Sequence, residues 1–305
     1  MPKRGGACNP VIGNRGDGLR NLSSRIQGLI AINVSAVIFG SAALFGKLDV
    51  SPFWIVAMRA GFAALTLASF GIARRDLAML PRGLWSVIAV TGIILALHWL
   101  TFFASVQFAG VAVATLSFAA FPLFTVLIEA AHQRRRPYGA EILAACAIVA
   151  AVGLLAGPQD GKGALEGITT GLISAATFAW FAHMSKQLSK ALPPLQISLY
   201  QNAVVALALA PLLLLAKPMP NQPMDWFWLA MLGMVMTALM HQLYFYALRR
   251  LSASVCSGFT ALEPVYAILF AAWLFGEAVT LWTLLSAALI IGASLTLLKF
   301  DKTQA

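Results

Sequence analysis

The feature that most constrains this chain is a series of ten long apolar segments joined by short connections. A transmembrane helix needs about 20 mostly apolar residues to cross about 30 Å of hydrocarbon, and each segment has close to that length. Backbone polar groups find no water inside a bilayer, so segments of this kind are expected to be helical. The connections leave no room for a soluble domain. The expected helices lie near residues 27–47, 52–72, 84–105, 110–131, 139–157, 165–187, 195–216, 226–248, 253–275 and 280–299.

The composition agrees with a membrane protein. Sixty per cent of the residues are apolar or aromatic and 10% are charged, and the mean hydropathy is +0.83. Soluble domains carry about 25% charged residues. Of the three cysteines, Cys146 and Cys256 lie inside expected helices, where we interpret them as small apolar filling. No disulfide framework and no metal-ligand spacing is present, so neither a metal nor a cofactor is expected.

The distribution of basic residues predicts the topology. The net charge of +10 gathers in the N-terminal segment, in alternate connections and at the C-terminus, whereas the other connections hold only Lys47, Lys162 and Lys217. Basic loops stay in the cytoplasm, so both termini are expected there. The charge is thus a topology signal, and no nucleic-acid partner is expected. The residues expected on the cytoplasmic side are Lys3, Arg4, Arg15, Arg20, Arg25, Arg74, Arg75, Arg82, Arg134, Arg135, Arg136, Lys186, Lys190, Arg249, Arg250, Lys299 and Lys302.

The sequence contains a weak internal repeat. The stretch "HWLTFFASVQFAG" aligns with "HQLYFYALRRLSA" and places His98 on His241. After a slip of one residue, Pro122 in "FAAFPLF" falls on Pro264 in "TALEPVY". Upstream, "FGSAALFGK" matches "FAWFAHMSK", with phenylalanine first and lysine last in each. The matches keep their order along the chain, which indicates duplication.

The repeat unit holds five helices, so the second copy must enter the membrane from the opposite side. We therefore predict an all-α membrane protein of ten transmembrane helices in two inverted repeats, 26–157 and 164–300, after a disordered cytoplasmic tail, 1–25. In secondary transporters such repeats are related by a pseudo-two-fold axis in the membrane plane, and substrate binds near mid-depth between them. A complete two-fold within one chain favours a monomer in the lipid bilayer.

The most specific stretch of the chain is "EPVYAILFAAWLFGEAVTLWTLLSAALIIGASL", residues 263–295. It resembles the second-repeat ending of the EamA-type drug/metabolite transporters, with Glu-Pro, then Gly-Glu at Gly276-Glu277, then a closing helix with Gly292. The first repeat departs from that pattern, because "HQRRRPY" stands where Gly-Glu is expected. Within the family the chain is most similar to the YddG-type amino-acid exporters. This resemblance implies efflux of amino acids, aromatic or aliphatic, across a bacterial inner membrane.

Glu263 lies beside Pro264 in the middle of an apolar run. A charged acid near the bilayer centre costs about 3 kcal/mol. One interpretation is that Glu263 binds a substrate ammonium group or carries a coupling proton. The other is that it satisfies the backbone where proline removes an N–H group, and the resemblance supports that shared architecture. Pro122 and Pro264 are expected hinges, and Phe121 is the mirror position of Glu263.

Further residues are candidates to line a central cavity. His98 and His241 are equivalent in the repeat, and Tyr244 shares a helix face with His241. Trp180 and Met184 share a face of the sixth expected helix and can form an apolar platform for a substrate side chain. The alternative for the histidines is hydrogen bonding between helices or coupling to protons, and for Trp180 it is packing against a neighbouring helix.

Arg59 lies near the middle of the second expected helix. An intramembrane arginine must pair or face water, and Glu263 is its deep acidic candidate partner. We expect a structural ion pair in preference to direct substrate binding.

These features favour one function. The chain is expected to be a secondary transporter that exports amino acids or similar small metabolites by alternating access through a largely apolar cavity. A permease or drug exporter for another metabolite is the alternative. An intramembrane enzyme is remote, because no acid, base or metal groups cluster, and no catalytic residue is assigned. The chain has no nucleotide-binding loop, so direct use of ATP is not expected.

Overall fold

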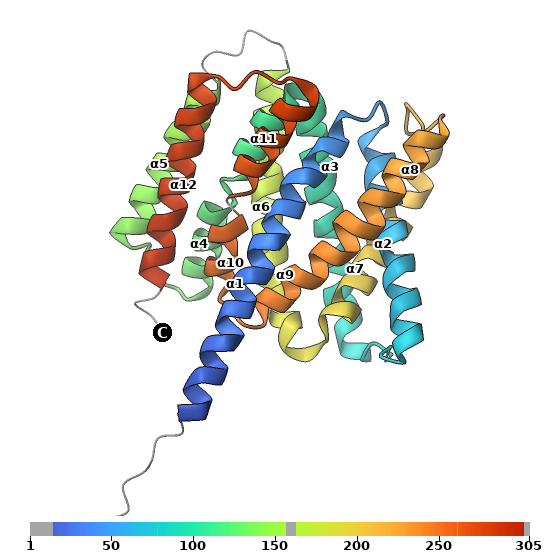
Figure 1. Ribbon diagram of the computed structural model, residues 1–305, viewed down its shortest axis with the longest axis horizontal. Coiled ribbons are helices and arrows are strands. Elements are labelled where there is room, and N and C mark those ends of the chain that lie inside the picture. Colours follow the sequence, from blue (N-terminus) through green and yellow to red (C-terminus); the bar gives the residue numbers. More distant parts are fainter. Residues whose placement is uncertain (1–14, 78, 157–162, 261, 302–305) are drawn as a thin grey trace, which may run out of the picture.

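A computed structural model describes residues 15–77, 79–156, 163–260 and 262–301 of the chain. Within these ranges the secondary structure is helical and contains no strand (Figure 1). The prediction of an all-helical protein is confirmed. The helices are α1 (Arg15–Ala43), η1 (Leu44–Lys47), α2 (Pro52–Arg74), η2 (Arg82–Leu84), α3 (Trp85–Phe118), α4 (Phe121–His132), α5 (Gly139–Ala156), α6 (Ala164–Ala191), α7 (Pro194–Leu209), η3 (Ala210–Leu214), α8 (Pro223–Met231), the π-helical η4 (Leu232–Leu239), α9 (Met240–Leu248), α10 (Ala253–Thr260), α11 (Glu263–Phe275) and α12 (Leu281–Asp301).

Five stretches of the described chain are long and apolar enough to cross a membrane by length and composition. Shorter apolar helices of 10–17 residues account for several of the other expected segments. α1 already begins at Arg15, inside the expected tail, and residues 1–14 lie outside the described ranges. The five long stretches are Ser24–Lys47, Pro52–Arg74, Arg82–Phe118, Pro194–Leu214 and Pro223–Leu248.

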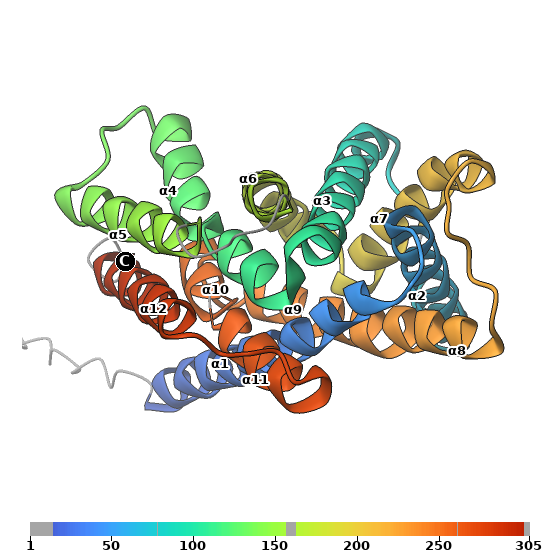
Figure 2. The same cartoon turned by 90° about the horizontal axis from the view of Figure 1, so that it is seen from above.

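The helices pack in a regular set of pairs. α3 packs against α6 as α1 packs against α9, and α4 packs against α6 as α1 packs against α11. α2 packs against α7, and α5 packs against α12. Figures 1 and 2 show α5 and α12 together at one side of the molecule and α2, α7 and α8 at the other, with α1, α3, α6 and α9 between them. The middle of the bundle is therefore built by helices from both halves of the sequence.

The two prolines begin helices. α3 ends at Phe118 and α4 begins at Phe121, with Pro122 in its first turn. α10 ends at Thr260 and α11 begins at Glu263, with Pro264 in its first turn. Proline is well tolerated there because the first N–H groups of a helix have no partner within the helix. Each proline thus marks a break between two helical pieces, as the sequence predicts, while hinge motion at the break stays a prediction.

The far ends of these two helices also match. Arg134, two residues after the end of α4, has φ 52°. Gly276, directly after the end of α11, has φ 65°. Glycine adopts this left-handed conformation without steric cost, whereas arginine does so rarely. Both ends carry a capping hydrogen bond from this region back to the last turn, from Arg135 N to Ala130 O and from Gly276 N to Ala272 O. The sequence departure at "HQRRRPY" therefore leaves the local backbone conformation intact.

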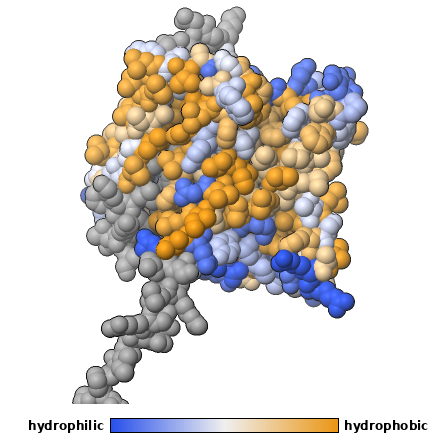
Figure 3. All heavy atoms as spheres, in the orientation of Figure 1, coloured by the Kyte–Doolittle hydropathy of each residue, from blue (hydrophilic) through white to orange (hydrophobic). Residues whose placement is uncertain are grey.

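Apolar side chains cover much of the surface. Figure 3 shows a broad apolar face, with the strongly hydrophilic residues mostly near its lower and upper ends. Leu65, Leu207 and Trp273 are 66%, 75% and 78% exposed. Exposed leucine and tryptophan on this scale suit a surface that contacts lipid.

One close approach holds the second break region, at the start of α11, in place. Gly40 of α1 faces the beginning of α11 so closely that an added Cβ would lie 2.8 Å from Tyr266 Cβ, 2.9 Å from Ala267 N and 2.9 Å from Glu263 O. Only glycine allows these two helices to approach so closely, and this contact fixes the position of Glu263.

Candidate functional site

A small cavity lies in the middle of the bundle, between α1, α2, α3 and α11. Its volume is about 20 Å³, which is room for about one water molecule. Rings from α1 and α3 form most of its wall, and three ionisable side chains face it. The described conformation is therefore closed around a centre lined by aromatic and ionisable side chains. Its lining includes Phe39, Trp99, Phe102, Phe103 and Phe118 together with Arg59, His98 and Glu263.

Arg59 enters the cavity from α2 and is 3% exposed. Its Nε donates a hydrogen bond to Thr237 Oγ1 at 3.1 Å. Its guanidinium carbon lies 3.9 Å from the ring centroid of Trp99 and 5.5 Å from that of Phe103. A guanidinium group over an aromatic face is stabilised by the ring quadrupole. Hydrogen bonding and the two rings thus hold the cation in place without an acid.

The arginine's hydrogen-bond partner comes from the π-helical segment. Thr237 Oγ1 itself donates to Leu232 O, five residues earlier, at 2.7 Å. π-Helical turns are rare and occur often at functional sites. The sequence pattern gives no sign of this turn, so the contact to Arg59 was not predicted.

Glu263 is the first residue of α11 and is 2% exposed. Its Oε2 has no hydrogen-bond partner in the described part of the chain. No nitrogen of Arg59 lies within 4.0 Å of a Glu263 oxygen. The expected ion pair is therefore not formed in this conformation, although both side chains face the same cavity.

The two histidines are buried and contact different partners. His98 Nδ1 lies 2.8 Å from Ser174 Oγ and 3.1 Å from Ser174 O on α6. His241 stacks on Trp99, with ring centroids 5.5 Å apart and an interplanar angle of 20°. His98 lines the cavity, whereas His241 lies behind the tryptophan. Trp99 thus contacts both the imidazole of His241 and the guanidinium of the cavity arginine.

Phe121 and Tyr244 belong to an aromatic cluster next to the cavity. Both are fully buried, at 0% and 1% exposure. Phe121 stacks on Phe118 at 5.2 Å, and Tyr244 meets Phe39 edge to face at 6.2 Å. They support the rings of the cavity wall.

Phe178 of α6 is the centre of this cluster and was missed as a candidate. Its ring lies 4.9 Å from that of His98 and 6.2 Å from that of Phe39. A signal was available, because Phe39 and Phe178 are the first residues of the two aligned stretches "FGSAALFGK" and "FAWFAHMSK".

Trp180 lies outside the central cavity. It is 52% exposed and borders a separate cavity of about 280 Å³ between α4 and α6, beside His132 and His183. Successive helix residues turn by 100°, so the face of α6 that carries Phe178 toward the centre directs Trp180 nearly opposite. Met184 is partly buried and does not line the central cavity in this conformation.

An ion pair joins two elements at one end of the bundle. Lys47 Nζ lies 2.6 Å from Glu277 Oε1, beside the sharp turn at Gly110 in α3. The lysine aligned with it in the repeat, Lys186, instead donates hydrogen bonds to Leu251 O at 2.6 Å and to a second carbonyl nearby. Of the two aligned lysines, Lys47 pairs with a carboxylate, whereas Lys186 binds the carbonyl groups of Leu248 and Leu251 at the end of α9 in the described chain.

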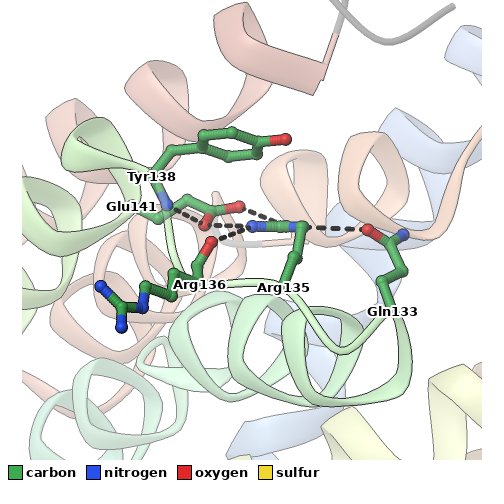
Figure 4. A network of polar contacts seen from close by, with 5 residues as sticks. All are labelled: Gln133, Arg135, Arg136, Tyr138 and Glu141. Atoms are coloured by element: carbon green, nitrogen blue, oxygen red, sulfur yellow. Dashed lines mark hydrogen bonds and ion pairs between the residues drawn. The ribbon is translucent and has the colours of Figure 1, made fainter.

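Arg135 occupies the position that aligns with Glu277, and its environment is local (Figure 4). Its guanidinium binds both carboxylate oxygens of Glu141 at 2.8 and 2.7 Å, and Tyr138 N–H donates to the same carboxylate at 2.8 Å. The hydrogen bonds that Arg135 donates to Glu141 raise the pKa of Arg135 above its usual range. This pair fixes the loop between α4 and α5 and does not bridge to Lys186 within the described residues.

Within the described residues no three His, Cys, Asp or Glu side chains gather to hold a metal ion.

Comparison with known proteins places this architecture in a family. The chain matches the EamA-like transporter family twice, over residues 26–157 and again over residues 165–299, and it belongs to that family. It is 25% identical over 273 residues to a protein from Archaeoglobus fulgidus that is described as an uncharacterized transporter. The aligned region covers 88% of this chain and 95% of that protein. A solved crystal structure shares the fold, with a TM-score of 0.67 and 19% identity over 90% of this chain and 95% of the other. The chain is therefore a multi-pass membrane transporter.

Proposed function

We propose that the protein is a secondary transporter that exports amino acids or similar small metabolites across a bacterial inner membrane by alternating access. In this proposal ten transmembrane helices form two inverted five-helix repeats, 26–157 and 164–300, with both termini in the cytoplasm. The chain acts as a monomer and uses neither a cofactor nor a catalytic residue.

The helix packing supports the inverted repeat. An axis that exchanges the halves converts the α1–α9 contact into the α6–α3 contact, and the α1–α11 contact into the α6–α4 contact. The α2–α7 and α5–α12 contacts convert into themselves. This is the pattern expected of a pseudo-two-fold axis in the membrane plane.

The observation that carries the proposal is the closed cavity between the two repeats. Its wall combines aromatic rings with Arg59 and Glu263, two buried ionisable groups that do not pair with each other. Intramembrane ionisable groups are expensive and usually mark a substrate or ion pathway. A cavity of about 20 Å³ is too small for any amino acid, so the repeats must move apart before a substrate can enter.

Flux in proteoliposomes tests the proposal. Purified protein is reconstituted, and uptake of labelled phenylalanine, methionine and threonine is measured with and without an imposed pH gradient. We expect saturable uptake above that of protein-free liposomes, and Ala43→Trp, which fills the cavity, should abolish it. Uptake that ignores the pH gradient indicates facilitated diffusion, whereas accumulation driven by the gradient indicates proton coupling. No amino-acid flux above protein-free liposomes would refute the substrate assignment.

A further inference from the structure

We propose that Arg59 and Glu263 bind the two ends of a zwitterionic α-amino acid, with the carboxylate on the arginine and the ammonium group on the glutamate. The inference rests on the proposed function and adds to it how the substrate is recognised. It starts from a basic and an acidic side chain that face one cavity and do not form an ion pair with each other.

Arg59 is positioned to bind a carboxylate. Guanidinium has five N–H donors in a rigid fork, which matches a carboxylate with two parallel hydrogen bonds. Its Nε is used by Thr237 at 3.1 Å, and one face lies over Trp99 at 3.9 Å. Among the described residues no acceptor lies within hydrogen-bonding distance of the two terminal nitrogens. The chain thus orients the guanidinium through Nε and the ring and leaves its outer edge for a ligand.

Glu263 is positioned to bind an ammonium group. It is 2% exposed, it lines the cavity, and Oε2 has no partner in the described chain. A buried acceptor without a partner destabilises the protein, so such an atom points to a ligand or to another conformation that satisfies it. Its backbone is fixed by the close approach to Gly40, so the carboxyl group has a defined place at the cavity wall.

The two groups come from different halves of the chain. Arg59 lies on α2 within residues 26–157, and Glu263 lies on α11 within residues 165–299, the two stretches that each match the family. A ligand that contacts both groups therefore joins the two repeats. The charges on one substrate also satisfy the charges on both repeats, so binding compensates for burying them.

The rest of the wall selects the substrate side chain. Phe39, Phe102 and Phe118 are 7%, 6% and 2% exposed and give the cavity an apolar surface. The preferred ligands are therefore α-amino acids with apolar or aromatic side chains. An amine without the carboxylate, or an acid without the ammonium group, leaves one buried charge unpaired, and such analogues are strongly rejected.

Competition binding tests this assignment without relying on transport. Labelled phenylalanine is bound to purified protein in detergent and displaced by phenylalanine, phenethylamine or hydrocinnamate. For the wild-type protein, each analogue should require at least about tenfold more ligand than phenylalanine. Equal competition by all three compounds would overturn the proposal, and this comparison does not depend on any variant folding.

The variants should show a crossed pattern. In Glu263→Gln the disadvantage of hydrocinnamate relative to phenylalanine should shrink at least about fivefold, because the ammonium partner is gone, while that of phenethylamine persists. In Arg59→Gln the disadvantage of phenethylamine should shrink instead. Arg74→Gln and Glu166→Gln remove the same charges at exposed positions and should leave all three affinities unchanged. Arg59→Lys should retain part of the preference for phenylalanine over phenethylamine.

The outcomes distinguish a failure of the proposed function from a failure of this inference. If the wild-type protein neither binds nor moves any amino acid, the proposed function fails. If it moves amino acids but each variant loses affinity for all three ligands by the same factor, the two residues act structurally and this inference fails while the proposed function stands. Size-exclusion profiles and melting curves show whether each variant is folded.

Discussion

Adding a single carbon atom at Gly40 tests the close contact between α1 and α11. Gly40→Ala places a Cβ 2.8 Å from Tyr266 Cβ and 2.9 Å from both Ala267 N and Glu263 O. Ordinary contact begins near 3.4 Å, so the two helices must separate by about 0.6 Å, and two of the obstructing atoms are backbone that cannot rotate away. Overpacking of this kind costs about 1–3 kcal/mol.

The assay is thermal unfolding of purified protein in detergent, with Gly61→Ala as the matched control. Both changes put alanine for glycine inside a helix, but a Cβ at Gly61 meets nothing within 4 Å. Gly61→Ala should gain up to about 1 kcal/mol from helix propensity. Gly40→Ala should instead lower the melting temperature by about 2–12 °C, since 1 kcal/mol corresponds to roughly 2–4 °C for chains of about 150–250 residues. Equal melting of the two variants, or a more stable Gly40→Ala protein, would refute the packing argument.

Three further changes follow from the site. Glu277→Gln breaks the 2.6 Å ion pair between Glu277 and Lys47, whose side chains are 23% and 36% exposed, respectively. The loss of about 1 kcal/mol or less should increase opening at that end, measured as the rate of cysteine labelling, up to about fivefold. Exchanging the two charged residues should restore the wild-type rate. Phe178→Ala should lower the free energy of unfolding by about 3–5 kcal/mol and impair phenylalanine flux. Trp180→Ala, at the exposed face of α6, should leave flux close to that of the wild type. A larger loss of flux for Trp180→Ala than for Phe178→Ala would contradict the placement of α6. Thr237→Val removes the hydrogen bond to Arg59 and should lower the free energy of unfolding, measured in melting curves, by about 1.5–3 kcal/mol. Unchanged stability would show that this hydrogen bond is not formed.

The helical class and the two helix breaks were predictable because each rests on local chemistry. Long apolar segments can satisfy their backbone in lipid only as helices. Pro122 and Pro264 lack an N–H donor, and in the structure each lies in the first turn of a new helix. Alignment of the two prolines then indicated that the breaks correspond.

The side chains of the cavity were harder to predict, because orientation is a tertiary property. In α6 apolar residues occur on all sides, so spacing shows that Trp180 and Met184 share a face but not whether that face points inward. The aligned phenylalanines Phe39 and Phe178 carried that information, since both copies of an inverted repeat direct equivalent residues toward the axis.

The partners of the buried charges were not predictable from the sequence. Arg59 donates a hydrogen bond to Thr237, which lies in a π-helical segment that the apolar pattern does not indicate. His98 finds Ser174 across the α3–α6 packing. The sequence predicted Glu263 as the partner of Arg59, because Glu263 was the available intramembrane acid. In the structure both side chains line one cavity and do not form an ion pair.

Alternating access to the central cavity is tested most directly by a single cysteine at Ala43, which lines the cavity and is 0% exposed. Cys8, Cys146 and Cys256 are first replaced by serine, and the protein is reconstituted in proteoliposomes. A membrane-impermeant thiol reagent is then added from one side or the other, with and without excess phenylalanine. Labelling is expected from both sides, because the buried site must open to each in turn, and it should be slower when phenylalanine is present. Labelling from one side alone while phenylalanine flux continues, or labelling that phenylalanine does not slow, would contradict this expectation.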